Sequence, residues 1–158
     1  MINMLDFVDI TKDNVHWYCK FKQNFENDIK IFMSCIYPEN SDFFVPLTEK
    51  GQLKWSYLIY DNKTIGAIWL EKEHSCLPVA KLSIFIADKD MRNRGIGQRA
   101  IDRYIRKNKN CLKLSQVTLD VCTENIRAIS CFKKCMFVCE QKYEKTNGVK
   151  VMRMVKSL

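Results

Sequence analysis

Two glycines and three arginines lie close together in the stretch IFIADKDMRNRGIGQRAI, residues 84–101, and this part of the sequence is well suited to bind an anion. An apolar run precedes Gly95 and Gly97, and a helical pattern follows them. At such a strand-to-helix junction the backbone N–H groups of the first helical turn lack internal partners, and the helix dipole adds partial positive charge. Glycine lets a ligand approach that backbone closely, so the turn is a candidate phosphate site.

Positive charge is concentrated at this turn. Arg92, Arg94 and Arg99 surround it, and guanidinium groups pair well with phosphate oxygens. The chain has 26 basic and 18 acidic residues, and its net charge of +8 favours nucleic acid, a membrane surface or a phosphorylated cofactor without distinguishing them. Neither GxxxxGK[ST] nor GxGxxG occurs, which excludes two common phosphate loops. A purely structural turn with solvated arginines is the competing interpretation.

Other residues capable of chemistry are more scattered. Asp120 lies near the end of the apolar stretch QVTLDVC, and Asn125 stands where the next helix needs an N-cap. His16 and His74 are too isolated to form a catalytic pair or a metal site. The eight cysteines form no CxxC pair and mostly fall in apolar periodic segments, so we expect reduced core thiols and no metal.

An alternating order of strands and helices positions these residues. Strands are predicted at residues 4–10, 53–60, 64–71, 79–87, 116–122, 137–145 and 149–158, with turns at DNK and TNG. Helices are predicted from Asp13 or Asn14 through Phe21, at residues 29–36, at residues 96–107 and at residues 124–135. The apolar face of the third is formed by Ile96, Ala100, Ile101, Tyr104 and Ile105, and the fourth has Ile126, Ile129 and Phe132 at apolar spacing. The candidate phosphate turn thus joins a strand to a helix.

The chain suits one globular domain, because it shows no linker or repeat that would mark a second. Its 158 residues are 47% hydrophobic, which permits a substantial core. The stretch MINMLDFVDITKDN carries Asp6 and Asp9 where an export signal needs an apolar run, and no segment approaches membrane-spanning length. We therefore expect a cytoplasmic protein with no membrane partner.

Two motifs resemble a known family. RNRGIG, Arg92 to Gly97, resembles the [RQ]xxGx[GA] signature of the GCN5-related N-acetyltransferase (GNAT) family, and it follows an apolar strand as in that family. LDVCTENIRAISCFKKCMF, Leu119 to Phe137, is similar to the family's segment of strand, Asn, RAI, aromatic, Lys and Gly-Phe. Met136 replaces the usual glycine, and we expect this to change only the exit from the helix.

The resemblance implies that residues 1–158 form a single N-acetyltransferase domain of the α/β class. Its central sheet would be mixed and mostly antiparallel, with about six to seven strands flanked by about four helices. The resemblance also implies transfer of an acetyl group to a primary amine by direct transfer in a ternary complex. A small cationic acceptor, aminoglycoside-like or polyamine-like, is expected, and the family is compatible with a homodimer.

Acetyl-coenzyme A is the co-substrate that the resemblance implies. The main chain of Phe85, Ile86 and Ala87 would contact the pantetheine arm and the carbonyl, and Asn125 and Phe132 belong to the same site. The phosphates would be held by the turn, whose residues are Arg92, Asn93, Arg94, Gly95, Ile96, Gly97 and Gln98. For Asn125, the role of helix N-cap is compatible with cofactor binding.

Asp120 is the candidate catalytic residue. It stands where similar ribosomal-protein acetyltransferases carry a glutamate base and aminoglycoside 6′-N-acetyltransferases an aspartate. A solvated strand-end charge, or an ion pair with Arg127, is the alternative. Phe132 occupies the place of the tyrosine that protonates the departing thiolate in many family members, and it cannot donate that proton. Cys131, Tyr104 or a water would then have to serve.

Three other functions compete with a small-molecule acetyltransferase. The first is N-terminal acetylation of a ribosomal or other protein, whose enzymes resemble the C-terminal half. The second is a sensor that binds acyl-coenzyme A without turnover, which the phenylalanine at position 132 suggests. The third, a nucleic-acid-binding module, is suggested by the charge of +8 and by the strand aromatics Trp55, Tyr57 and Trp69, although such residues more often belong to a core and no nucleic acid is expected.

Overall fold

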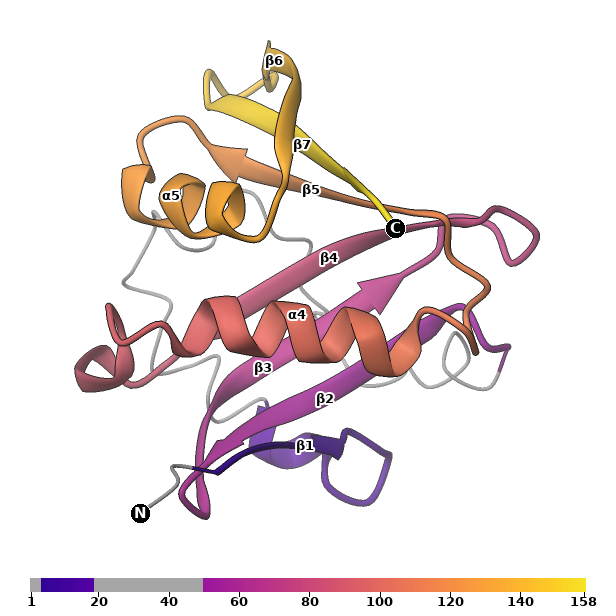
Figure 1. Ribbon diagram of the computed structural model, residues 1–158, viewed down its shortest axis with the longest axis vertical. Helices are drawn as coiled ribbons and strands as arrows, with labels where there is room; N and C mark the ends of the chain where they lie inside the picture. The colour runs from indigo at the N-terminus through magenta and orange to yellow at the C-terminus, as the bar shows by residue number, and fades with distance from the viewer. Residues whose placement is uncertain (1–3, 19–49) are drawn as a thin grey trace.

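A seven-stranded sheet forms the framework of the computed structural model, which describes residues 4–18 and 50–158 (Figure 1). Its strand order is β1-β2-β3-β4-β5-β7-β6. The pair β4–β5 is parallel, and every other neighbouring pair of this sheet is antiparallel. This confirms the predicted mixed, mostly antiparallel sheet. The strands are β1 (Leu5–Asp9), β2 (Leu53–Tyr60), β3 (Lys63–Glu71), β4 (Val79–Ile86), β5 (Gln116–Cys122), β6 (Val138–Glu144) and β7 (Lys150–Ser157).

Two helices, α4 (Ile96–Asn108) and α5 (Ile126–Lys134), pack on the same face of the sheet and lie in front of it in Figure 1. A short 3-10 helix, η1 (Lys89–Met91), precedes α4, and residues 15–18 are helical. The predicted helix at residues 29–36 lies outside the described residues. Within those residues, none of the helices is both long and apolar enough to cross a membrane.

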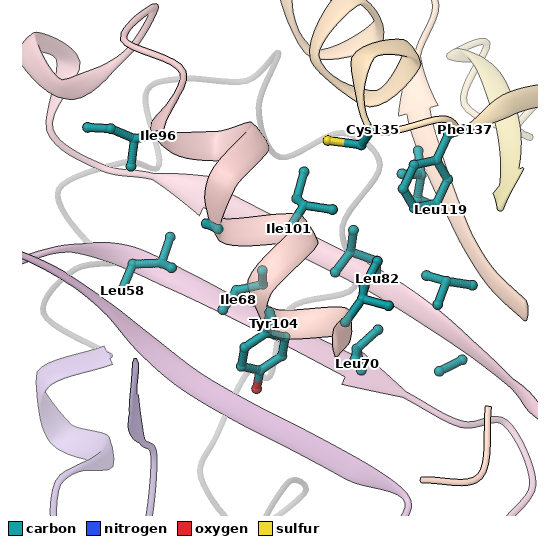
Figure 2. Packing of buried hydrophobic residues seen from close by; sticks show 14 of the residues in the cluster. Leu58, Ile68, Leu70, Leu82, Ile96, Ile101, Tyr104, Leu119, Cys135 and Phe137 are labelled. Atoms are coloured by element: carbon teal, nitrogen blue, oxygen red, sulfur yellow. The ribbon is translucent and has the colours of Figure 1, made fainter. Parts of the chain in front are cut away.

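The main core lies between α4 and the sheet. The residues predicted for the apolar face of α4 are all buried, namely Ile96, Ala100, Ile101, Tyr104 and Ile105. Figure 2 shows Ile101 and Tyr104 close to Ile68, Leu70 and Leu82 of the sheet, with Cys135 and Phe137 extending the cluster toward β5. Because this packing fixes α4 over β2 to β4, it also fixes the position of the turn at the start of the helix.

A second apolar cluster lies on the opposite face of the sheet. Trp55, Tyr57 and Trp69 are 4%, 5% and 1% exposed, and Tyr18 packs edge-on against Trp55 with ring centroids 4.6 Å apart. Their burial places these aromatic rings in a core, where they cannot stack on nucleic-acid bases. This observation removes one of the two sequence arguments for a nucleic-acid-binding module.

The parallel strands β4 and β5 begin together and then diverge, as Figure 1 shows. Their ladder consists of the pairs Val79–Gln116, Ala80–Val117 and Lys81–Thr118. On its other side β4 continues to pair with β3 as far as Ile86, and β5 pairs with β7 over its whole length. The remaining parts of β4 and β5 therefore border the space between the two halves of the sheet.

The end of α5 explains how the chain accommodates methionine in place of the family's glycine. Met136 has a φ of 68°, the left-handed conformation that usually follows a helix C-cap. The N–H of Met136 donates to Lys133 O and that of Phe137 to Phe132 O, both at 3.0 Å, which is the Schellman pattern. The rings of Phe132 and Phe137 pack edge-on, 6.1 Å apart, and supply the apolar contact that accompanies this motif.

Two sequence predictions about packing are wrong. Ile126 was expected at the apolar spacing of its helix but is 69% exposed, because the face of α5 that meets the core is formed by Ile129, Phe132 and Cys135. The cysteines are free thiols among the described residues, yet not all lie in the core. Three of them occupy loops or the exposed edge strand β6, namely Cys76, Cys111 and Cys139.

Candidate active site

A cavity of about 400 Å³ lies where β4 and β5 have diverged. Its walls come from residues 82–86 of β4, residues 119–121 of β5, the first turns of α4 and one face of α5. The segment from Met91 to Gln98, apart from Arg94, borders one end of it. Of the predicted cofactor-binding residues, Ala87 and Arg94 do not line the cavity. The others do, namely Phe85, Ile86, Arg92, Asn93, Gly95, Ile96, Gly97, Gln98, Asn125 and Phe132.

Glycine stands at positions 95 and 97 of the turn for different structural reasons. Gly95 is the N-cap of α4 and has a φ of 72°, a left-handed conformation that favours glycine. A Cβ built on Gly97 would have ordinary contacts, 3.5 Å from Cys131 Sγ and 3.7 Å from Ile86 Cδ1. The protein itself therefore does not require glycine at position 97. Its missing side chain instead keeps the cavity open beside the helix.

The N-terminus of α4 has the properties of an anion site. Gly95 provides no side-chain hydrogen bond to the first turn of the helix, and that turn holds no acidic residue. The turn lines the cavity at Ile96, Gly97 and Gln98, so its backbone N–H groups and the positive end of the helix dipole lie at the cavity wall. Arg92 is oriented beside them, because its Nε donates to Ile86 O over 2.9 Å.

The cationic lining differs in part from the sequence prediction. Arg92 borders the cavity as expected, whereas Arg94 does not, and Arg99 lies over the ring of Tyr60 with its guanidinium carbon 5.8 Å from the centroid. Two further cations of the lining, Arg127 and Lys134, come from α5. From sequence, Arg127 was considered only as an ion-pair partner of Asp120, and Lys134 was not singled out. They lie seven residues apart on one helix face, a spacing that would have identified them.

Asn125 is the N-cap that the sequence predicts, and its role in cofactor binding stays a prediction. Its side-chain oxygen accepts the N–H of Ala128 at 3.2 Å, so it caps α5, and the residue also borders the cavity. Phe132 lines the cavity as well, one turn further from Ala128 along the same helix. The N-cap holds the start of α5 at the cavity rim, while the phenylalanine ring contributes only an apolar surface there.

Asp120 lines the cavity, but two cations already hold its carboxylate. Lys81 Nζ donates to one oxygen over 2.6 Å, and Arg153 Nε donates to the other over 2.9 Å. The side chain is 4% exposed, so it is not a solvated strand-end charge, and its ion pairs within the described residues are with Lys81 and Arg153 rather than with Arg127. Burial opposes ionisation, but the hydrogen bonds from Arg153 and Lys81 outweigh it and lower the pKa of Asp120. The catalytic role of Asp120 stays a prediction, and a carboxylate held in this way is a weak base.

The two alternative proton donors lie in different places. The Tyr104 hydroxyl is buried and lies 3.0 Å from Ser56 Oγ; burial raises its pKa, and the residue does not line the cavity. Cys131 does line it. A hydrogen bond from Cys135 and the charge of Lys134 lower the pKa of the Cys131 thiol, although burial opposes them. Of the two, Cys131 alone is placed to meet a bound molecule.

Thiol reagents should therefore report on occupancy of the cavity. We expect iodoacetamide to alkylate Cys131 readily at neutral pH, because its lowered pKa increases the thiolate fraction. Coenzyme A should slow this labelling at least about tenfold, since Cys131 lines the cavity. Peptide mass mapping separates Cys131 from the exposed Cys76, Cys111 and Cys139, which act as internal controls. Equal protection of all four would contradict the placement of Cys131.

The model of the Acetyltransferase (GNAT) family matches residues 14–137, and the chain belongs to this family of N-acetyltransferases. No curated protein matches the sequence.

Several solved structures share the fold at low sequence identity. The spermidine N-acetyltransferase of Vibrio cholerae, in complex with coenzyme A and spermine, is 16% identical with a TM-score of 0.78, over 97% of this chain and 95% of its own. RimL, a ribosomal L7/L12 α-N-protein acetyltransferase, is 11% identical with a TM-score of 0.78, over 98% and 90%. The aminoglycoside acetyltransferase AAC(6′)-Ib with coenzyme A is 14% identical with a TM-score of 0.76, over 98% and 95%.

Proposed function

We propose that the protein transfers an acetyl group from acetyl-coenzyme A to a primary amine, with both substrates bound together between β4 and β5. The observation that carries the proposal is the cavity itself. It joins the open edge of β4 to a helix N-terminus whose N-cap, Gly95, makes no side-chain hydrogen bond. Its lining includes three cations, Arg92, Arg127 and Lys134, and one carboxylate, Asp120. An elongated molecule with an anionic end and an amide-rich arm is complementary to such a cavity.

The residues present fit coenzyme A. The first turn of α4, with Arg92 beside it, would hold the pyrophosphate through backbone N–H groups and a guanidinium. The β4 edge from Leu82 to Ile86 borders the cavity and offers main-chain groups along an extended arm. When bound, acetyl-coenzyme A supplies the activated acyl group as a thioester.

The residues at the cavity are better placed to align the amine and the thioester than to transfer a proton. Holding the acceptor amine and the thioester in one cavity replaces an encounter between free molecules, which alone gives a large acceleration. A backbone N–H of β4 is the kind of donor that stabilises the developing negative charge on the carbonyl oxygen. Phe132 offers no proton to the leaving thiolate, so Cys131 or a water is the remaining candidate donor at this wall.

The acceptor that we propose is a small cationic amine of the polyamine or aminoglycoside kind. Support comes from the fold shared with the Vibrio cholerae spermidine N-acetyltransferase and with AAC(6′)-Ib. Acetylation of a protein N-terminus is the second candidate. It is supported by the fold shared with RimL, whose TM-score of 0.78 equals that of the Vibrio cholerae spermidine N-acetyltransferase. A cytoplasmic location and a homodimer remain predictions; a Vibrio cholerae relative is a dodecamer.

One experiment separates these functions. The protein is incubated with acetyl-coenzyme A and a panel of polyamines, aminoglycosides and peptides with free N-termini, and thiol release and acetylated products are followed. Saturable coenzyme A binding with turnover on a polyamine or aminoglycoside is the expected result. Turnover on peptides alone would support the second candidate, and binding without turnover on any amine would indicate a sensor. Absence of coenzyme A binding would overturn the proposal.

A further inference from the structure

Four charged side chains of alternating sign cross the sheet at the point where β4 and β5 diverge. Glu71 of β3 pairs in register with Lys81 of β4, and Asp120 of β5 pairs with Arg153 of β7. Lys81 and Asp120 join these two pairs through a 2.6 Å ion pair. We call Glu71, Lys81, Asp120 and Arg153 the charged row. We propose that it holds β4 and β5 at their divergence and thereby sets the width of the cavity, so that Asp120 is a positioning residue rather than a base.

The location of the charged row gives it this effect. Lys81 and Thr118 form the last pair of the parallel ladder, and Asp120 lies two residues beyond it, where β5 already borders the cavity. The bond from Lys81 therefore crosses between the strands just where their backbone hydrogen bonding ends. Arg153 holds the same carboxylate from the other side, with Nε and one terminal nitrogen at 2.9 and 3.2 Å. Asp120 is thus fixed to both halves of the sheet.

The face on which the row lies also matters. Ala80 and Leu82 belong to the core beneath α4, so Lys81, between them along the strand, points to the opposite face. Asp120 alternates in the same way with Leu119 and Val121. The charged row therefore links the strands from the side away from both helices, where α4 and α5 provide no support. It supplies a link that packing on the helical face does not.

The surroundings of Asp120 favour positioning over proton transfer. Its side chain is 4% exposed and accepts hydrogen bonds at both oxygens, so taking up a proton would disrupt two ion pairs. Tyr143 lies on the same side, with its ring centroid 5.8 Å from the Arg153 guanidinium carbon. Burial, followed by the charge of Asp120, raises the pKa of Tyr143, so this hydroxyl stays neutral and leaves the charged row intact.

The test compares Asp120→Asn with Lys81→Met, and it rests on the proposed function because it uses coenzyme A as the probe. Each variant removes the ion pair between Lys81 and Asp120 that links β4 to β5. We expect each to raise the Kd for coenzyme A about tenfold, while kcat at saturating acetyl-coenzyme A changes less than about twofold. In the free protein, amide hydrogen exchange should accelerate at residues 82–86 and 119–121 but not within α4. Lys81→Met retains the Arg153–Asp120 ion pair, so this variant still tests the proposal if Asp120→Asn does not fold.

If Asp120 acts as a base, the two variants should give a different pattern of kcat, Kd and hydrogen exchange. Asp120→Asn would then lower the saturating kcat at least about a hundredfold, and Lys81→Met would leave the Kd and the hydrogen exchange unchanged; either result overturns the proposal. Lys156→Met is the matched control, because its partner Asp102 is 3.5 Å away and neither residue lines the cavity. If the wild-type protein binds no coenzyme A, the proposed function fails, while hydrogen exchange in the free protein still tests the charged row.

Discussion

Gly66→Ala is expected to lower the free energy of unfolding by about 3 kcal/mol and to abolish coenzyme A binding. A Cβ built on Gly66 of β3 would lie 2.0 Å from the carbonyl oxygen of Phe85 and 3.0 Å from its carbonyl carbon. The obstructing atoms are backbone, so the clash cannot be relieved by rotating a side chain and β4 must shift. Because residues 82–86 of β4 form a wall of the cavity, the shift would alter the binding site as well as the sheet.

Two measurements check this prediction. The melting temperature should fall by about 9 °C, and calorimetric titration should detect no coenzyme A binding. Ile68→Val is the control on the same strand, since it removes one buried methylene, costs about 1 kcal/mol and leaves the Phe85 carbonyl in place. It should retain full affinity for coenzyme A. A Gly66→Ala protein with the same melting temperature as the wild type would contradict the close approach of β3 to β4.

The order of the elements could be predicted because most of the described strands and helices have a clear apolar pattern, although the largely exposed β6 does not. The strand predicted at residues 116–122 is β5 itself, and the predicted apolar face of α4 is buried throughout. The exact ends of an element were harder to predict where the geometry of a turn sets them. β3 begins at Lys63 rather than at Thr64, because Asp61 and Asn62 both take positive φ, 48° and 64°, and form a two-residue hairpin turn that lets Lys63 pair with Tyr60.

The candidate site could be predicted where its residues are contiguous in sequence and not where sheet pairing brings them together. The turn from Arg92 to Gln98 is one such contiguous segment. The partners of Asp120 are not, because Lys81 and Arg153 lie 39 and 33 residues away from it. Only the register of β5 against β7 and the end of the β4–β5 ladder place the three side chains together. From sequence, the family resemblance therefore suggested that Asp120 is a base, whereas the geometry indicates that Asp120 links the strands.

Gly97→Asp is expected to weaken coenzyme A binding at least about a hundredfold while leaving the fold as stable as the wild type. A Cβ at this position has only ordinary contacts, at 3.5 Å from Cys131 Sγ and 3.7 Å from Ile86 Cδ1, so the backbone need not move. A carboxylate in the first turn of α4 interacts favourably with the helix dipole, worth about 0.5 kcal/mol. The same carboxylate would stand in the cavity wall where we propose that the pyrophosphate binds, and would repel it.

Two variants at the same position separate charge from size. Gly97→Asn matches the shape of aspartate without its charge, and Gly97→Ala adds only the Cβ. We expect affinity for coenzyme A to fall in the order glycine, alanine, asparagine, aspartate, with the largest step between the last two. Raising the ionic strength should narrow that last step, because salt screens repulsion between the carboxylate and the phosphates. Equal affinities of the asparagine and aspartate variants would show that the anionic end of coenzyme A does not bind at this helix terminus, whereas an affinity gap that closes with salt would place it there.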